Sequence, residues 1–128
     1  MRYLVTGGTG SVGSALVRRL VMYGHNVVVL ARSEDRLLQL QRDLGGIEIL
    51  VGNVSDYAAV RTAMEGVQGV YHLAASKHVG LAAQFPEQAI DTNLGGTMNV
   101  LQASLEVHPG FVIASGSDKS ETPNGVYA

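Results

Sequence analysis

The sequence predicts an α/β protein in which helices cover both faces of a parallel sheet, and three observations lead to this fold class. Short apolar, β-branched runs alternate with segments of helical periodicity, as in successive βαβ units. The run NVVVLA at 26–31 is continuously apolar after Asn26, which is typical of a strand buried on both faces. A glycine-rich turn joins the first apolar run to the first helical segment. We therefore predict a doubly wound sheet of about five strands in the order 3-2-1-4-5.

Each predicted strand is short and rich in aliphatic residues, and each predicted helix has a recognisable start or end. The predicted strands are 2–6, 26–31, 47–54, 69–75 and 110–115. The predicted helices are 14–24, 33–44, 55–66 and about 86–107. Gly24 is expected at the end of the first helix, Ser33 at the N-cap of the second, and Ser55 or Asp56 at the N-cap of the third.

Composition indicates a single globular domain over 1–128. The chain is 46% hydrophobic, and its net charge of −2 with no basic run makes nucleic acid and anionic membranes poor partners. It has no cysteine, and its four scattered histidines do not predict a metal site. His72 is expected to be a hydrogen-bonded core histidine, and Met22, Met64 and Met98 are expected in the core. No apolar stretch reaches the roughly 20 residues of a membrane helix, so a cytoplasmic location is expected.

The glycine-rich turn predicts a dinucleotide-binding loop. Its spacing is G-x-x-G-x-x-G between a strand and a helix, where glycines allow a tight turn and let backbone amides approach a pyrophosphate. A third glycine at this spacing also lets the helix pack closely. The alternative is a tight turn with no ligand. The residues expected to contact the cofactor here are Gly7, Thr9, Gly10, Ser11, Val12 and Gly13.

The residues at the ends of the second and third predicted strands indicate which dinucleotide is bound and where its adenine lies. Arg32 and Ser33 stand where an acidic residue would hold a ribose hydroxyl, which favours NADP over NAD. The acidic pair at 34–35 could still reach a ribose, so NAD stays open. Asn53 and Val54 are expected near the adenine, where the amide oxygen of the asparagine can accept from the adenine amino group.

Two motifs narrow the family. In the first motif, YHLAASKHV at 71–79, an alanine-rich strand end leads into Lys77. The second motif, TNLGGTMN at 92–99, contains Thr92, Asn93, Gly96, Thr97 and Asn99. Together with the glycine loop, this pattern resembles the extended short-chain dehydrogenase/reductases that act on nucleotide sugars. Within that group, Lys-His-Val and the stretch SDKSETPNGVYA are similar to the polysaccharide-biosynthesis nucleotide-sugar 4,6-dehydratases, exemplified by the UDP-N-acetylglucosamine enzymes.

The resemblance implies roles for particular residues. Tyr127 would move a proton at the sugar C4 hydroxyl, and Asp118 and Lys119 would act on the sugar during elimination of water across C5 and C6. Lys77 would lie near the cofactor and substrate phosphates. The further cofactor contacts implied are Leu73, Ala74, Ala75, Asn93 and Ser115. The net reaction is redox-neutral, so NADP is not consumed.

The resemblance also implies parts that this sequence does not contain. The family lysine, four residues after the tyrosine, falls beyond Ala128, as does the sugar-binding region. We therefore expect 1–128 to be a C-terminally truncated Rossmann domain without a substrate domain, inactive alone. The alternatives are a non-catalytic NAD(P) sensor module, a subunit completed by a partner chain, and a related epimerase or reductase. The apolar strand at 110–115 lacks its neighbouring strand, so we expect self-association.

Overall fold

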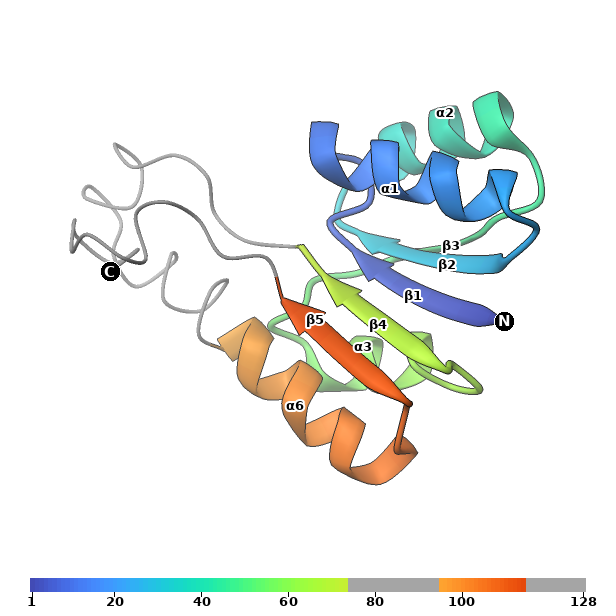
Figure 1. Cartoon of the computed structure of the whole chain (residues 1–128). Helices are drawn as coiled ribbons and strands as arrows, with labels where there is room; N and C mark the ends of the chain where they lie inside the picture. The colour runs from blue at the N-terminus through green and yellow to red at the C-terminus, as the bar shows by residue number, and fades with distance from the viewer. Residues whose placement is uncertain (74–94, 115–128) are drawn as a thin grey trace, which may run out of the picture.

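The computed structural model describes residues 1–73 and 95–114, which form a parallel sheet with helices on both faces (Figure 1). The strand order is β3-β2-β1-β4-β5, and every neighbouring pair is parallel. The strands are β1 Arg2–Thr6, β2 Asn26–Ala31, β3 Glu48–Val51, β4 Gly69–His72 and β5 Phe111–Ala114. The helices are α1 Ser11–Met22, α2 Glu34–Leu44, α3 Tyr57–Ala63 and α6 Gly96–Val107. The predicted fold class and strand order are confirmed.

The boundaries differ from the predicted ones mainly at the carboxyl ends of strands. The strand predicted at 47–54 ends at Val51, because the chain turns there and Asn53 begins a side-chain-stabilised turn. The first helix begins at Ser11, earlier than predicted, directly after the glycine loop. Gly24 follows the end of this helix with a φ of 81°, as its predicted role requires. The predicted helix start near residue 86 lies outside the described residues.

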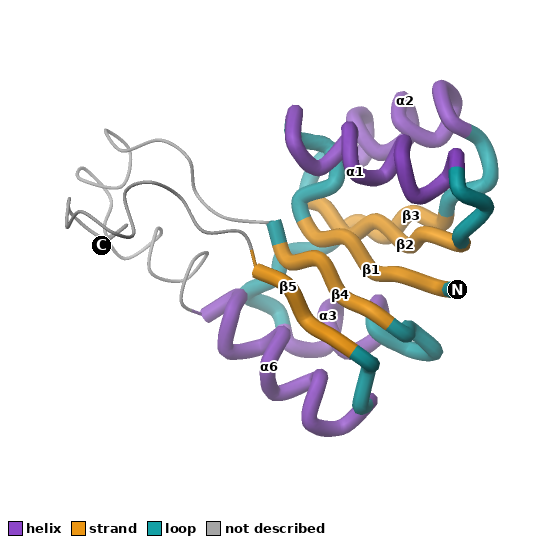
Figure 2. Tube along the Cα trace, viewed as in Figure 1, coloured by secondary structure: helices purple, strands orange, loops and turns teal. Residues whose placement is uncertain are grey.

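Two hydrophobic layers hold the sheet. Helices α1 and α2 lie on one face, and α3 and α6 lie on the other (Figure 2). Alternate residues of a strand enter opposite layers, so that Leu4 packs toward α3 and α6 whereas Tyr3 and Val5 pack toward α1 and α2. All of β2 from its second residue onward is buried, as the continuous apolar run predicts.

The prediction that three methionines lie in the core is confirmed for Met64 and wrong for Met22 and Met98. Met64 is fully buried, whereas Met22 is 76% exposed and Met98 is 58% exposed. Met22 is the last residue of α1. Met98 lies on the outer side of α6, because this helix buries its small residues Gly96 and Ala103 against the sheet side. Unbranched apolar residues at helix ends and outer faces cannot be told from core residues by composition alone.

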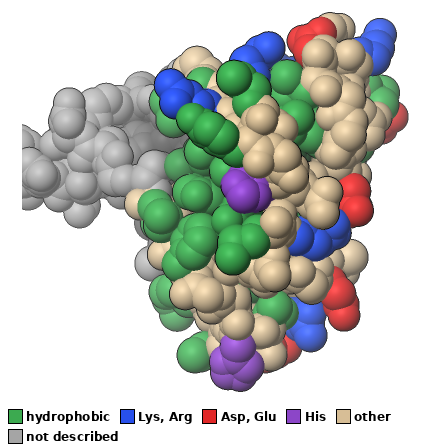
Figure 3. Space-filling model, turned by 45° about the vertical axis from the view of Figure 1, so that its right-hand side comes forward, with side chains coloured by type: hydrophobic (Ala, Val, Ile, Leu, Met, Phe, Trp, Pro, Cys, Tyr) green, Lys and Arg blue, Asp and Glu red, His purple; other side chains and the backbone are tan. Residues whose placement is uncertain are grey.

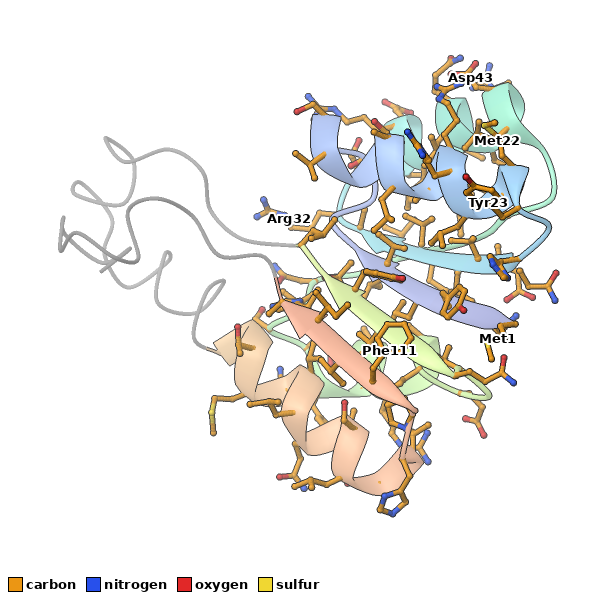
Figure 4. All side chains as sticks on the ribbon, viewed as in Figure 1. Met1, Met22, Tyr23, Arg32, Asp43 and Phe111 are labelled. Atoms are coloured by element: carbon orange, nitrogen blue, oxygen red, sulfur yellow. The ribbon has the colours of Figure 1, made fainter. Side chains whose placement is uncertain are left out.

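On the α1 side of the sheet, β4 and β5 are incompletely covered by the described helices. Tyr71 on β4 and Phe111 on β5 are half-buried there, with ring centroids 5.4 Å apart, and Tyr3 adds its ring 5.8 Å from Phe111. Figure 3 shows hydrophobic side chains gathered across this part of the molecule, and Figure 4 labels Phe111 on the β5 strand. Across the described ranges, no helix has both the length and the apolarity needed to cross a membrane.

Candidate functional site

The carboxyl ends of all five strands meet at one edge of the sheet. Chain connections from β1 lead to β2 on one side, whereas β4 and β5 lie on the other side of β1. This makes the space between the ends of β1 and β4 the topological switch point, where open parallel sheets bind their ligands. Thr6 ends β1 and His72 ends β4, and the two residues are register partners. The glycine loop, which follows β1, therefore begins at the edge that the fold favours.

The glycine loop has a geometry that larger residues would not allow. Gly7 has a φ of 71°, and its amide donates to the carbonyl oxygen of Leu30 at 3.1 Å. A Cβ added to Gly13 would overlap the carbonyl oxygen of Gly7 and come within 2.8 Å of the Cα of Gly8. The first turn of α1 thus rests directly on the loop backbone, as predicted for the third glycine. This close approach is the cradle that a pyrophosphate-binding turn requires.

The amino end of α1 is open. Its N-cap is Gly10, no side chain caps it, and its first turn holds no acidic residue. The first helical hydrogen bond runs from the Ser14 amide to the Gly10 carbonyl at 2.8 Å, so the amides of Ser11, Val12 and Gly13 come before the intrahelical bonding begins. A helix start of this kind stabilises a negatively charged group through its amides and its dipole. The loop and the helix start together fit a dinucleotide phosphate.

Arg32 follows β2 and is exposed at the same edge, where Figure 4 labels it. Ser33 is the N-cap of α2, and its Oγ accepts from the Arg36 amide at 3.3 Å, as the predicted cap requires. That bond uses the oxygen as acceptor, so the hydroxyl can still donate to a ligand. Glu34 and Asp35 occupy the first turn of α2 and are exposed, so acidic groups also stand near this edge.

The loop after β3 is tied down from two sides. The Oδ1 of Asn53 accepts from the Ser55 amide at 3.0 Å and keeps a second lone pair for an adenine amino group. The side chain of Val54 is buried in the core, so its part in any ligand contact falls to its backbone. The Nδ2 of Asn99 donates to the carbonyl oxygen of Val54 at 2.8 Å, which fixes this loop to α6. Sequence reasoning placed Asn99 in a motif and missed this role.

A buried polar chain lies under the switch point. The Thr6 Oγ1 and His72 Nδ1 are 2.7 Å apart, and the His72 Nε2 lies 3.2 Å from the Thr97 Oγ1. The Leu73 amide donates to both the carbonyl oxygen and the Oγ1 of Thr6, at 3.0 Å each. Burial lowers the pKa of the His72 imidazole. The prediction of a hydrogen-bonded core histidine is confirmed, and its two threonine partners are found only in the structure.

Some of the predicted site residues lie within the described ranges and others do not. It brings the glycine loop, Arg32, the Asn53 loop and Leu73 to one edge. The predicted residues that lie outside the described ranges are Ala74, Ala75, Lys77, Asn93, Ser115, Asp118, Lys119 and Tyr127. Within 1–73 and 95–114, no three His, Asp or Glu side chains are grouped so that they could hold a metal ion.

An open glycine-rich strand–turn–helix at the switch point of a 3-2-1-4-5 parallel sheet defines a Rossmann fold of the nucleotide-binding class. Residues 3–128 match the family described as polysaccharide biosynthesis protein. The chain belongs to this family, in the nucleotide-sugar branch of the extended short-chain dehydrogenase/reductases.

Two curated relatives show how much of a longer protein the chain represents. It is 35% identical over 126 residues to an uncharacterized membrane protein of Methanocaldococcus jannaschii, covering 96% of this chain and 38% of that protein. It is 33% identical over 127 residues to the UDP-glucose 4-epimerase of Rickettsia rickettsii, covering 94% of this chain and 37% of the epimerase. The chain thus spans well under half the length of these relatives.

The chain also corresponds to less than half of each of three similar solved structures. The structure of Pen from Bacillus thuringiensis superposes with a TM-score of 0.94 at 31% identity, over 98% of this chain and 41% of that one. A UDP-glucose 4-epimerase of Stenotrophomonas maltophila with bound NAD gives 0.84 at 27% identity, over 93% and 38%. The dTDP-glucose 4,6-dehydratase DesIV of Streptomyces venezuelae with bound NAD gives 0.76 at 28% identity, over 88% and 38%.

Proposed function

We propose that this chain is the NADP(H)-binding part of a nucleotide-sugar 4,6-dehydratase or epimerase-like enzyme. The observation that carries the proposal is the uncapped start of α1, packed through Gly13 onto the Gly7 carbonyl at the switch point of the sheet. Relatives and structural neighbours that act on UDP-glucose or dTDP-glucose, two of them with NAD bound, support the substrate class.

Each described element has a part in holding the cofactor. The amides of 11–13 at the start of α1 would bind the pyrophosphate, since nothing in the first turn neutralises them. Arg32 would pair with a 2′-phosphate, because a guanidinium presents several donors to phosphate oxygens. Asn53 would accept from the adenine amino group through the free lone pair of its Oδ1. Leu73, joined to Thr6 by two hydrogen bonds, would border the cofactor at the end of β4.

The catalytic part of the proposal concerns residues beyond the described ranges. Tyr127 would take and return the proton of the sugar C4 hydroxyl, and Asp118 and Lys119 would serve elimination of water across C5 and C6. When bound, the nicotinamide supplies a hydride acceptor for C4 and a hydride donor for C6. A tyrosine titrates near 10 and a lysine near 10.4 in water, so both need neighbouring charges to exchange protons at neutral pH.

The test of the proposal is a binding measurement with NADP+ and NAD+ on the 128-residue chain. We expect NADP+ to bind more tightly, and Arg32→Ala to weaken NADP+ binding by about tenfold while leaving NAD+ nearly unchanged, since one charged phosphate contact is lost. Arg42→Ala is the matched control, because Arg42 is an exposed arginine in the last turn of α2. Tighter binding of NAD+ would overturn the choice of cofactor, and binding of neither dinucleotide would overturn the function.

A second candidate is a non-catalytic NAD(P)-binding or sensor module, or a subunit completed by a partner chain. The observation in its favour is that the described site residues, namely the glycine loop, Arg32 and Asn53, are ones that fit a dinucleotide. Incubation with UDP-N-acetylglucosamine and NADP+ separates the candidates. We expect no turnover by this chain alone, and sugar turnover by the isolated chain would overturn that expectation.

We also propose that the chain self-associates and that it is located in the cytoplasm. Ile113 on β5 is 50% exposed, and no described strand pairs with the outer side of β5. We expect sedimentation at tens of micromolar to show a species larger than a monomer, and Ile113→Lys to shift it toward the monomer. A monomeric wild-type chain at that concentration would contradict self-association.

A further inference from the structure

The first turn of α6 is joined to both loops of the proposed cofactor site by separate, partly buried connections. We propose that Thr97, His72 and Asn99 are positioning residues for the dinucleotide, with Thr97 and His72 setting the glycine loop and Asn99 setting the adenine loop. This inference rests on the proposed function of the chain as a dinucleotide binder. It assigns these three side chains a role in ligand affinity that is separate from their contribution to folding.

The first connection fits an order of donors and acceptors in which the His72 ring is the Nε2–H tautomer. Because the Thr6 Oγ1 accepts from the Leu73 amide at 3.0 Å, its own hydrogen can donate to the His72 Nδ1 at 2.7 Å. In that tautomer the imidazole hydrogen is on Nε2, which would donate to the Thr97 Oγ1 at 3.2 Å. Burial lowers the pKa of His72, which agrees with a neutral ring in this arrangement. The connection therefore runs from α6 through β4 to the last residue of β1.

This connection ends where the glycine loop begins. Thr6 is followed by Gly7, whose carbonyl oxygen is in direct contact with the backbone of Gly13. A change in the position of Thr6 is passed to Gly7, and from there to the first turn of α1, because these backbones touch and leave no room for adjustment. The amides that would bind the pyrophosphate belong to that turn. The hydroxyl of Thr97 is therefore coupled to the phosphate end of the site.

The second connection reaches the other loop. The Nδ2 of Asn99 donates to the carbonyl oxygen of Val54 at 2.8 Å, next to Asn53. Gly96 allows this approach, since a Cβ there would lie 2.6 Å from the Cγ2 of Val54 and 3.8 Å from the Cε1 of His72. One small helix turn thus packs on both Val54 and His72. Residues two apart on α6 serve two different loops.

The two connections predict different ligand profiles, which a loss of folding would not produce. The probes are NADP+ and adenosine 2′,5′-bisphosphate, which has the adenine end of NADP+ but no pyrophosphate. Thr97→Val, which removes the hydrogen bond to the His72 Nε2, is expected to weaken NADP+ binding about tenfold and to change bisphosphate binding less than about threefold. Asn99→Ala is expected to weaken both by a similar factor of about five, because both ligands carry the adenine.

Controls separate positioning from folding. Thr97→Ser keeps the hydroxyl and is expected to restore NADP+ affinity to within about threefold of wild type. Ser104→Ala removes another hydroxyl of α6, one that donates to the Val100 carbonyl at 2.7 Å, and is expected to change neither affinity. His72→Asn keeps a polar group toward Thr6 and loses the bond to Thr97, so it measures the same bond if Thr97→Val does not fold. Thermal unfolding without ligand is recorded for each variant.

The outcomes are distinct. If the wild-type chain binds no dinucleotide, the proposed function is overturned and this inference falls with it. If NAD+ binds more tightly than NADP+, the same experiment is done with NAD+ and AMP as the two probes. If the wild-type chain binds a dinucleotide, and Thr97→Val and His72→Asn bind it with the same affinity, only this inference is overturned and the proposed function stands. Equal losses for both probes in Thr97→Val and in Thr97→Ser would also overturn it, because that pattern belongs to a general loss of folding.

Discussion

The starts of α1 and α2 follow neighbouring strands on the same side of the sheet, yet they are built in opposite ways. α2 has a serine N-cap whose Oγ accepts from the Arg36 amide, with Glu34 and Asp35 in its first turn. α1 begins at Gly10 with no side-chain cap and no acidic residue. An N-cap and nearby carboxylates satisfy the amides and the positive end of a helix internally. α1 leaves both unsatisfied by its own side chains.

The third helix is capped in the same way as α2 and unlike α1. The Oδ1 of Asp56 caps α3 by accepting from the Ala58 amide at 3.1 Å. Two helices that follow strands at the same edge thus carry their own stabilising side chains, while the helix after the glycine loop does not. The difference indicates that α1 gives up local helix stability so that an external anion can occupy its start.

The largest expected effect comes from a substitution of Gly13, where the first turn of α1 contacts the backbone of the glycine loop. Gly13→Ala would place a methyl group on the Gly7 carbonyl, whose backbone cannot move aside, and should cost about 3 kcal/mol of unfolding free energy and more than tenfold in dinucleotide affinity. Gly95→Ala is the matched control, since nothing lies within 4 Å of a Cβ there. Denaturant unfolding and NADP+ titration measure both quantities. Wild-type affinity in Gly13→Ala would refute this account of the loop.

A second substitution would convert the start of α1 into the type seen in α2. Val12 is 65% exposed in the first turn, so Val12→Glu places a carboxylate where α2 has its own. We expect about 0.3–1 kcal/mol of added stability from the helix dipole, together with about tenfold weaker NADP+ binding through charge repulsion. Val12→Gln controls for size. Tighter binding by Val12→Glu would show that no anion occupies this helix start.

A smaller effect is expected where a helix is already capped. Asp56→Ala removes the side-chain cap of α3 and should lower the free energy of unfolding by about 1 kcal/mol. Dinucleotide affinity should stay within about twofold of wild type, because the α3 start is not assigned to the ligand. Ser55→Ala, at the exposed neighbour, is the control for a change outside the cap. A large loss of affinity in Asp56→Ala would remove the distinction between the α1 and α3 starts.

The smallest effect concerns the buried histidine below the glycine loop. Burial lowers the folded-state pKa of His72, so between that pKa and the unfolded value of about 6.5 the unfolded chain binds more protons. Stability should therefore fall as the pH is lowered through about 6.5, and be fully present above it. Thermal unfolding between pH 7.5 and 5.5 measures this dependence, which His72→Asn should flatten. An unchanged slope in His72→Asn would exclude His72 as its source.

Much of this architecture was predictable because it depends on local sequence patterns. Continuous apolar runs predicted buried parallel strands, and Ser33 and the pair Ser55 or Asp56 predicted helix starts through short-range capping chemistry, with Asp56 as the observed cap. The glycine spacing predicted the loop, since glycine adopts the positive φ of Gly7 without steric cost and only glycine fits the contact at Gly13. The methionines show where local pattern fails. Met22 and Met98 are as apolar as Met64, and only the direction in which each helix faces separates them.

The sequence by itself determined the fold class, the strand order and the position of the glycine loop, because periodicity, capping and backbone sterics act over a few residues. Only the tertiary structure decided which distant side chains meet. Thr6 and His72 are 66 positions apart, and His72 and Thr97 are 25 apart, yet β4 and α6 bring them into one hydrogen-bonded chain. Asn99 reaches Val54 across 45 positions in the same way. Such pairings depend on the register of the strands and on the packing of α6 onto the sheet, which no local pattern of the sequence encodes.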